Sequence, residues 1–351
     1  MKLEKLLFVF VLPLLVSCQP SHPSTSTSSL SSSNSSSEKE SSSISSSEES
    51  TSSSSSVSYD DKETSFQVVS PQGAPAAALA RYANDDSVVF GGAQDVKAAF
   101  TSANSDFIIF DSVNGMKLSK DNYRLVRMVT FGNLYLVSTG NDEDGVPSED
   151  DFIFSYGKDL VPDLAFRAVS ELTIDAYGAQ VSDTGPVLKS GIYQGTKVDY
   201  VVSSYPVIAN MMADTTKLTD LSITMNVAEE FGKKYGTDGF PQAGLFIKKS
   251  LQDDSSKRVE IEHFLTVFDA DVRDLIAGGE HAVSFLNDYG DNTKQASRFG
   301  FNSTTLEKSQ ENNGLAFLAS EDNPSLDEYS VFEKPLGITL PEGILSSYYP
   351  A

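Results

Sequence analysis

Short apolar runs alternate with amphipathic segments along the chain from Phe66 onward. The runs at 66–70, 88–90 and 107–110 have the length and the β-prone composition of strands, and turn-forming or polar residues follow each of them. Between the second and third runs, residues 95–103 place their apolar side chains on one face of a helix. Strands that alternate with helices predict an α/β fold with a mainly parallel sheet.

A second set of strand and helix patterns follows an acidic, glycine-bearing break at 141–151. Around and beyond this break, further strands are predicted at 125–131, 134–137, 152–156, 174–181, 198–202 and 243–248, and helices at 184–190 and from Pro162. The apolar residues of 261–276 recur at positions i, i+3 and i+4 over four turns, which predicts a long helix.

The first 58 residues do not share this pattern. Residues 1–17 carry two lysines ahead of an apolar run that is shorter than the about 20 residues needed to span a bilayer, which predicts an export signal. Residues 21–58 contain 24 serines and almost no large apolar side chain, so they cannot bury enough surface to offset chain entropy. We expect a lipoprotein signal peptide at 1–17 and a disordered, serine-rich tether at 18–64.

The single cysteine, Cys18, follows the apolar run in the tetrapeptide Leu15-Val16-Ser17-Cys18. A disulfide within the chain is excluded because there is no second cysteine. The tetrapeptide resembles the bacterial lipobox, whose cysteine is diacylated and becomes the new N-terminus. This resemblance implies a stable anchor, because two or more acyl chains hold where one binds only marginally. It implies a location on the extracytoplasmic face of the cell membrane.

The charge and the residue types exclude two classes of function. A net charge of −23 argues against nucleic acid as a partner, because phosphate contacts need clustered Lys and Arg. Catalytic triads and zinc sites need His or Cys, yet His22 lies in the tether and His263 and His281 lie in helical segments. A glycine-rich phosphate loop with Lys-Ser/Thr is not present in the sequence. We therefore predict no enzyme activity, no cofactor and no metal.

Several short pieces, in their order and spacing, resemble the solute-binding proteins of ABC transporters, in the group for nitrate, sulfonate, taurine and thiamine precursors. The pieces are Gln72-Gly73-Ala74-Pro75 after the first strand, Phe90-Gly91-Gly92 before helix 95–100, strand 106–110, Tyr156-Gly157 before Val161-Pro162-Asp163, Gly191 with Val198-Asp199-Tyr200 before Tyr205-Pro206, and 241–246. The resemblance extends over residues 66 to about 320.

The resemblance implies a fold and a set of partners. The family has the type 2 periplasmic-binding-protein fold, in which two α/β lobes joined by two crossover strands hold a ligand in the cleft between them. Lobe I is expected at 65–138 and 249–351, and lobe II at 139–248. The implied partners of this monomer are a small-molecule ligand, an ABC permease and its ATPase.

Candidate ligand-binding residues lie in the loops that would face this cleft, where strand ends and helix N-termini supply donors. They are Gln72, Gly73, Ala74, Gly92, Asp111, Ser112, Asn114, Tyr156, Gly157, Ser204 and Tyr205. Each of these residues also has a possible structural role. The glycine loops are also ordinary turns, Asp, Ser and Asn at a strand end also cap helices, and core packing competes for Tyr156.

The implied function is a lipid-anchored importer component that captures a small polar or heteroaromatic solute by hinge closure. Sulfonates, oxyanions and thiamine-precursor-like molecules are the candidate ligands. Lys158 is the one basic residue in the candidate loops, which favours a neutral or aromatic ligand. The alternative is a surface structural or adhesion lipoprotein that keeps the two-lobed fold without transport. An enzyme is the third hypothesis.

Overall fold

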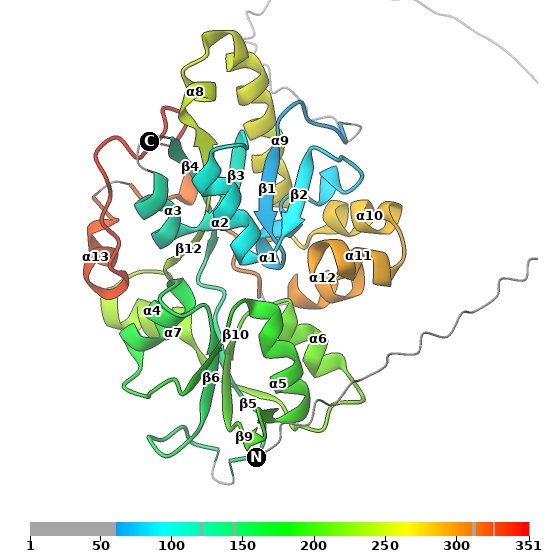
Figure 1. Ribbon diagram of the computed structural model, residues 1–351, viewed down its shortest axis with the longest axis vertical. Helices are drawn as coiled ribbons and strands as arrows, with labels where there is room; N and C mark the ends of the chain where they lie inside the picture. Colours follow the sequence, from blue (N-terminus) through cyan, green and yellow to red (C-terminus); the bar gives the residue numbers. More distant parts are fainter. Residues whose placement is uncertain (1–60, 120–121, 143–144, 311–313, 326, 351) are drawn as a thin grey trace, which may run out of the picture. The chain divides into compact units, whose positions relative to one another are not determined.

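Figure 1 shows the computed structural model, which describes residues 61–119, 122–142, 145–310, 314–325 and 327–350. All of these residues belong to one compact unit, 55–351. The predicted signal peptide, Cys18 and the predicted tether up to residue 60 lie outside the described residues.

The first sheet has five strands in the order β2-β1-β3-β12-β4. Their bounds are β1 Val68–Pro71, β2 Val88–Gly91, β3 Phe107–Asp111, β4 Tyr123–Phe131 and β12 Pro241–Lys248. Strand β1 runs parallel to β2 and β3, as expected where helices connect the strands, and β12 runs antiparallel to β3 and β4.

We call this sheet and the helices around it lobe I. The helices are α1 Ala74–Ala77, α2 Ala93–Ser102, α3 Ser112–Ser119, α8 Lys249–Gln252, α9 Arg258–Ile276, α10 Glu280–Tyr289, α11 Asn292–Phe299 and α12 Ser303–Gln310, with the short 3-10 helices η1 Ala80–Tyr82 and η3 Ser255–Lys257. In Figure 1 these elements occupy the upper part of the view.

The second sheet has the order β11-β5-β10-β6-β7 and forms lobe II with helices α4 to α7. The bounds are β5 Tyr135–Ser138, β6 Ile153–Tyr156, β7 Ala176–Gly178, β10 Tyr200–Ser203, β11 Ser222–Asn226, α4 Val161–Val169, α5 Thr184–Ser190, α6 Val207–Ala213 and α7 Val227–Tyr235, with the small hairpin β8 Ile192–Tyr193 and β9 Thr196–Lys197. The strand expected at 174–181 is shorter, because the 3-10 helix η2, Val181–Asp183, follows it.

The chain passes between the lobes at 132–134 and 236–240, not at the predicted boundaries of 138 and 248. Strand β5 pairs with β10 and β11 and therefore belongs to lobe II, whereas β12 pairs with β3 and β4 and belongs to lobe I. The pairing partners lie far away in the sequence, so the local pattern of each strand does not contain this information.

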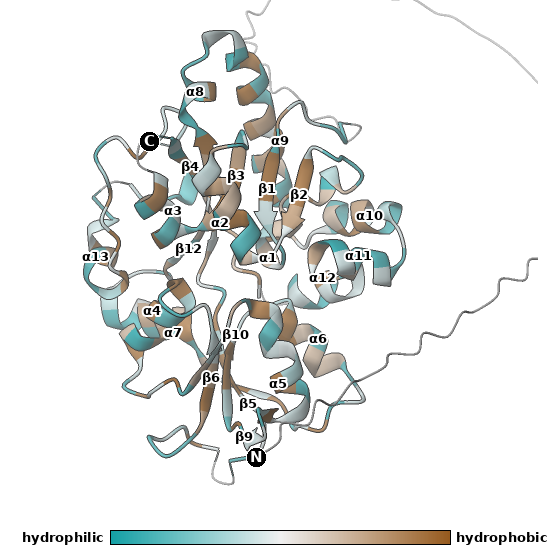
Figure 2. Ribbon diagram, in the orientation of Figure 1, coloured by the Kyte–Doolittle hydropathy of each residue, from teal (hydrophilic) through white to brown (hydrophobic). Residues whose placement is uncertain are grey.

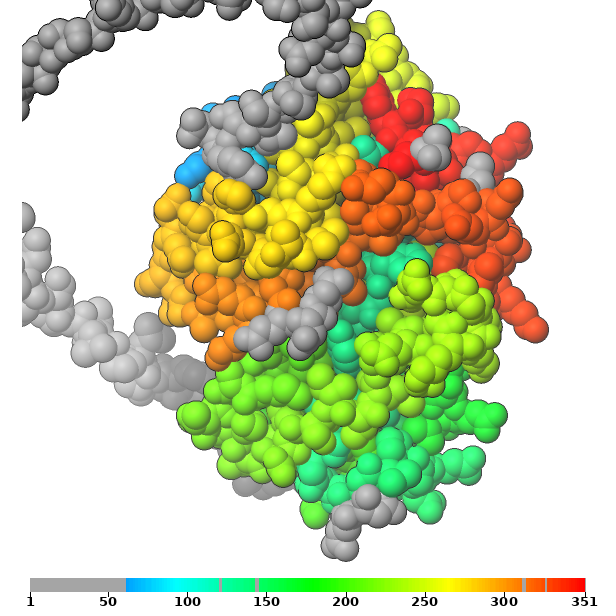
Figure 3. All heavy atoms as spheres, turned by 180° about the vertical axis from the view of Figure 1, so that it is seen from behind, coloured from blue at the N-terminus to red at the C-terminus, as the bar shows by residue number. Residues whose placement is uncertain are grey.

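The C-terminal segment contacts both lobes. Phe317 and Leu345 form isolated bridges with strand β4, and α13 (Ser330–Leu336) follows the 3-10 helix η5 (Ser320–Asp322). The ring of Phe332 in α13 has its centroid 5.9 Å from that of Phe131 and 6.1 Å from that of Phe231 in α7. Seen from behind, the orange and red C-terminal residues lie beside the yellow-green residues of lobe II (Figure 3).

The long helix predicted at 261–276 is confirmed as the C-terminal part of α9. Its core residues are Ile261, Phe264, Leu265, Phe268, Val272 and Leu275, all buried. Ile276, also expected to face inward, is 40% exposed because it is the last residue of the helix. The Phe264 ring packs on the rings of Phe66 and Phe107, with centroids 5.7 and 4.5 Å apart. Figure 2 shows the strands of both sheets mainly in brown, which marks hydrophobic residues.

Candidate functional site

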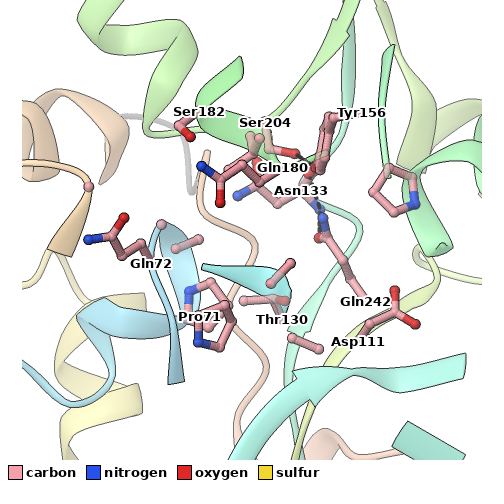
Figure 4. Close-up of a pocket in the computed structure, with 18 of the residues that line it drawn as sticks. Pro71, Gln72, Asp111, Thr130, Asn133, Tyr156, Gln180, Ser182, Ser204 and Gln242 are labelled. Atoms are coloured by element: carbon pink, nitrogen blue, oxygen red, sulfur yellow. Dashed lines mark hydrogen bonds between the residues drawn. The ribbon is translucent and has the colours of Figure 1, made fainter. Parts of the chain in front are cut away.

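A cavity of about 160 Å³ lies between the lobes, at the C-terminal ends of β1, β3, β6 and β10. Figure 4 shows side chains from both lobes that line it. The placement follows from the parallel strands, because loops and helix N-termini gather at their C-terminal ends. The cavity is smaller than the roughly 300–1,000 Å³ of typical ligand pockets, which favours a compact solute.

The structure brings together seven of the eleven predicted binding residues around this cavity: Gln72, Gly73, Ala74, Asp111, Tyr156, Ser204 and Tyr205. The other four, Gly92, Ser112, Asn114 and Gly157, are not among the residues that line it. The binding role of all eleven stays a prediction.

All four residues form hydrogen bonds within the chain, and the Asn114 side chain in α3 donates to Asp111 at 3.0 Å. The polar turn expected after β3 is the start of helix α3, and the buried Ser112 hydroxyl donates to the Pro241 carbonyl at 2.8 Å. The Gly92 N–H donates to the Asp95 carboxylate at 3.3 Å. The Gly157 carbonyl accepts the N–H of Leu160 at 2.8 Å in a tight turn.

The loop after β1 is held by the C-terminal end of α11. The Gln72 side-chain amide donates to the carbonyls of Ser297 and Arg298 at 3.0 and 3.2 Å, and the Gly73 N–H donates to the Phe299 carbonyl at 2.8 Å. Gly73 has a φ of 100°, which side-chain-bearing residues rarely adopt. The loop therefore presents mainly backbone and the Ala74 methyl group to the cavity.

Asp111 forms a hydrogen bond across the two lobes. Its carboxylate accepts the N–H of Val161, the first residue of α4 in lobe II, at 3.0 Å. Leu160, at the N-cap of α4, provides no side-chain cap, so Asp111 satisfies a helix donor that the helix itself leaves unpaired. Burial raises the pKa of Asp111, while the N–H donors of Asn114 and Val161 act in the opposite direction.

Tyr156 and Ser204 form a polar pair on the lobe II side of the cavity. Their hydroxyl groups lie 2.5 Å apart, and both residues are buried. The two residues lie side by side because Tyr156 ends β6, Ser204 follows β10, and these strands are parallel neighbours. Burial raises the pKa of Tyr156 well above its usual value, so the phenol is neutral and able to donate a hydrogen bond.

Asn133 and Gln242 connect the first crossing to both lobes. The Asn133 side chain donates to the Tyr205 carbonyl at 2.8 Å and accepts the Tyr205 N–H at 2.9 Å. The Gln242 side chain in β12 pairs in the same manner with the Asn133 backbone, at 2.9 and 3.0 Å. Both residues line the cavity, and the hydrogen bonds of their side-chain amide groups hold its walls in place.

Gln180, Ser182 and Thr130 add polar groups to the lining. Figure 4 shows the Gln180 side chain directed toward the space between the lobes. Sequence reasoning missed these residues and the Asn133–Gln242 pair. Gln180 and Ser182 follow β7, just as other candidate residues follow β1, β3, β6 and β10, so the sequence contained this signal.

Two further observations concern the described part of the chain. No three His, Cys, Asp or Glu side chains come together there in a way that could hold a metal ion. None of its helices combines the length and the apolar composition that crossing a membrane requires.

No protein-family model and no curated protein matches the chain, but solved structures do. An ABC transporter protein from Parabacteroides distasonis has a TM-score of 0.55 at 15% identity, over 80% of this chain and 98% of that one. The chain has the fold of ABC-transporter solute-binding proteins. The ligand-binding component of an import system from Staphylococcus aureus, with zinc bound, gives 0.56 at 10% identity, over 77% and 90% of the two chains. The periplasmic aliphatic sulphonate-binding protein SsuA from Escherichia coli gives 0.54 at 10% identity, over 79% and 86%.

The solute-binding fold agrees with the resemblance found in the sequence. The expected two-lobed α/β architecture is confirmed. At 10 to 15% identity the likeness concerns the fold, so the ligands of these proteins are properties of those proteins alone.

Proposed function

We propose that the protein is the solute-binding component of an ABC importer. It captures a small polar or heteroaromatic solute by hinge closure and delivers it to a membrane permease that an ATPase drives. The observation that supports this function is the small cavity lined from both lobes, in a fold shared with import components. A ligand that contacts both lobes binds the closed form better than the open form, and this difference in affinity drives closure.

The proposed location follows from the N-terminal sequence. The protein is a monomer anchored through acylated Cys18 on the extracytoplasmic face of the cell membrane. The serine-rich segment tethers the two lobes at a distance that lets them reach a permease in the same membrane.

A thermal-shift screen of the full-length chain in mild detergent tests the binding function. The panel contains sulfonates, oxyanions, amines, alcohols and heteroaromatic vitamin precursors, and we expect at least one class to raise the melting temperature. If no class does so at millimolar concentration, the alternative of a structural or adhesion lipoprotein takes precedence. Neighbouring genes for a permease and an ATPase would independently favour transport.

Cys18→Ser is expected to release the protein from the membrane. The thiol is the acylation point, so its removal leaves no acyl chain to hold the protein there. Detergent phase partitioning of whole-cell extracts measures this, with Ser17→Ala as the control because alanine is also a small residue. Equal partitioning of Cys18→Ser and the unchanged chain into the detergent phase contradicts the lipid anchor.

Ala74→Leu is expected to weaken binding of the ligand found in the screen by about tenfold or more, which is about 1.4 kcal/mol. Ala74 lines the cavity and is 6% exposed, so a larger side chain there takes space from the ligand. Ala98→Leu, on the exposed face of α2, is the matched control. Calorimetric titration measures both variants. Unchanged affinity in Ala74→Leu would place the ligand outside this cavity.

A further inference from the structure

The charges around the cavity are unusual for an anion-binding site. Among the described residues that line it, Asp111 is the one acidic residue, and there is no Lys, Arg or His. Most of the remaining lining is apolar or aromatic, including Phe110, Leu160 and Val207. A sulfonate or an oxyanion that entered this space would therefore lose its hydration and meet a carboxylate in place of a cation.

The backbone position best suited to an anion is already occupied. Helix α4 has nine residues, and the partial positive charge of its N-terminus points to the side where the lobes meet. Asp111 from lobe I accepts the N–H of Val161 at this N-terminus. An anionic ligand would have to displace this carboxylate from α4 and then lie beside it.

Asp111 accepts hydrogen bonds from neutral donors, and among the described residues no cation forms an ion pair with it. One carboxylate oxygen accepts the backbone and side-chain N–H groups of Asn114, at 2.9 and 3.0 Å, and the other accepts only the Val161 N–H among the described residues. The positive charge that acts on it from within the chain is that of Lys117 in α3, which does not line the cavity. The second oxygen therefore keeps acceptor capacity beyond this one bond.

We infer that the ligand is a small organic cation with a compact apolar body, such as an amine or a protonated heteroaromatic base. Asp111 is its counter-ion, and the aromatic rings of Phe110 and Tyr156 contact its body and the face of its charged group. This inference rests on the proposed solute-binding function and selects, from the solute classes named there, one that excludes sulfonates and oxyanions. It also differs from the aliphatic sulphonate named for the Escherichia coli neighbour.

Probes that share one body and differ only in charge test the inference. Benzylammonium, benzyl alcohol and phenylmethanesulfonate form one series, and butylammonium, butan-1-ol and butane-1-sulfonate form another. Each is titrated calorimetrically into the full-length chain in mild detergent, at neutral pH and fixed ionic strength. In at least one series we expect the ammonium probe to bind about tenfold tighter than the alcohol, and the sulfonate not to bind.

Two variants of Asp111 test whether its carboxylate causes the preference for the ammonium probe. Asp111→Asn should abolish the preference for ammonium over alcohol, whereas Asp111→Glu should retain part of it because the charge stays. Asp106→Asn is the matched control: it lies at the other end of β3, accepts the Gln67 N–H at 3.0 Å and does not line the cavity. We expect it to bind the probes as the unchanged chain does. If Asp111→Asn fails to fold, the selectivity of the unchanged chain still decides the question.

The outcomes separate this inference from the proposed function. Sulfonate binding as tight as ammonium binding, failure of both ammonium probes to bind, or a preference that survives in Asp111→Asn overturns the cationic ligand. A neutral or anionic solute found in the thermal-shift screen would do so while supporting the importer. A screen in which no solute of any charge binds would count against the proposed function as well.

Discussion

Arg81→Met is expected to lower the free energy of unfolding by about 3 to 5 kcal/mol, the usual cost of removing one partner of a buried ion pair. Arg81 lies in the 3-10 helix η1 and Asp271 in α9, and their side chains are 0% and 8% exposed. The guanidinium Nε and Nη2 atoms donate to the two carboxylate oxygens at 2.8 and 2.6 Å. The Arg81 guanidinium also lies 4.9 Å from the ring centroid of Phe285 in α10.

The expected loss comes mainly from the charge that is left behind. Methionine restores most of the apolar volume of arginine, but it leaves the Asp271 carboxylate buried without its partner. Burial raises the pKa of Asp271, and Arg81 counteracts this effect. In the variant the folded-state pKa therefore rises further above the unfolded value. The loss of stability should grow as the pH rises through that pKa and shrink at acidic pH, where the carboxyl group is neutral.

Urea unfolding of three further variants provides the comparison. Arg258→Met removes the exposed pair of Arg258 with Glu262, 2.7 Å apart, and should cost far less than Arg81→Met because water screens an exposed pair. Asp271→Leu alone should be costly, because it leaves the Arg81 cation buried. The double variant Arg81→Met/Asp271→Leu should recover much of the loss. A loss in Arg81→Met that equals that of Arg258→Met would contradict the argument.

The parts of the fold that local patterns specify were predictable from the sequence. Helix α9 is the clearest case, because its buried residues follow a 3.6-residue period that only an amphipathic helix produces. The assignment of β5 and β12 to the lobes was wrong for a different reason. Each strand completes a sheet through partners about 60 to 140 residues away in the sequence, and the alternation within one strand is the same in either sheet.

Asp111 shows how far sequence reasoning reached at the candidate site. Its place at the end of a strand predicted a position near the cleft, and helix capping was the competing role. The structure shows both: Asp111 lines the cavity and accepts an N–H from the start of a helix. That helix is α4, 50 residues further along the chain and in the other lobe. The spacing of residues near Asp111 carries no information about this partner.

Asn133 was missed because its surroundings in the sequence indicate only a turn. It lies between Gly132 and Leu134, where two predicted strands meet, and Asn is common in such turns. Its actual partners, Tyr205 and Gln242, are 72 and 109 residues away. They become visible only once both lobes are assembled.

The second large effect is expected from Asn133→Ala. Asn133 is 1% exposed, and its side chain satisfies both the N–H and the carbonyl of Tyr205, so its removal costs these two groups their bonds to it. A lost bond costs about 1 to 3 kcal/mol for a fully buried group, and these two bonds are partly buried, so we expect a loss of about 2 kcal/mol in urea unfolding. Ligand affinity should fall as well, because Tyr205 and Ser204 belong to the cavity wall that Asn133 fixes.

Asn141→Ala is a control that separates the effect of Asn133 on ligand affinity from a general loss of stability. The Asn141 side chain donates to the carbonyls of Gly191 and Val198 at 2.9 and 2.8 Å, so it also satisfies two backbone groups, but all of them belong to lobe II. We expect this variant to lose stability while it binds the ligand of the screen normally. Asn133→Ala should lose both stability and ligand affinity. The Asn133 side chain bonds to Tyr205 in lobe II, and the Asn133 backbone bonds to Gln242 in lobe I, so Asn133 joins the two lobes. Equal affinity in the two variants would show that Asn133 stabilises the fold without shaping the cavity.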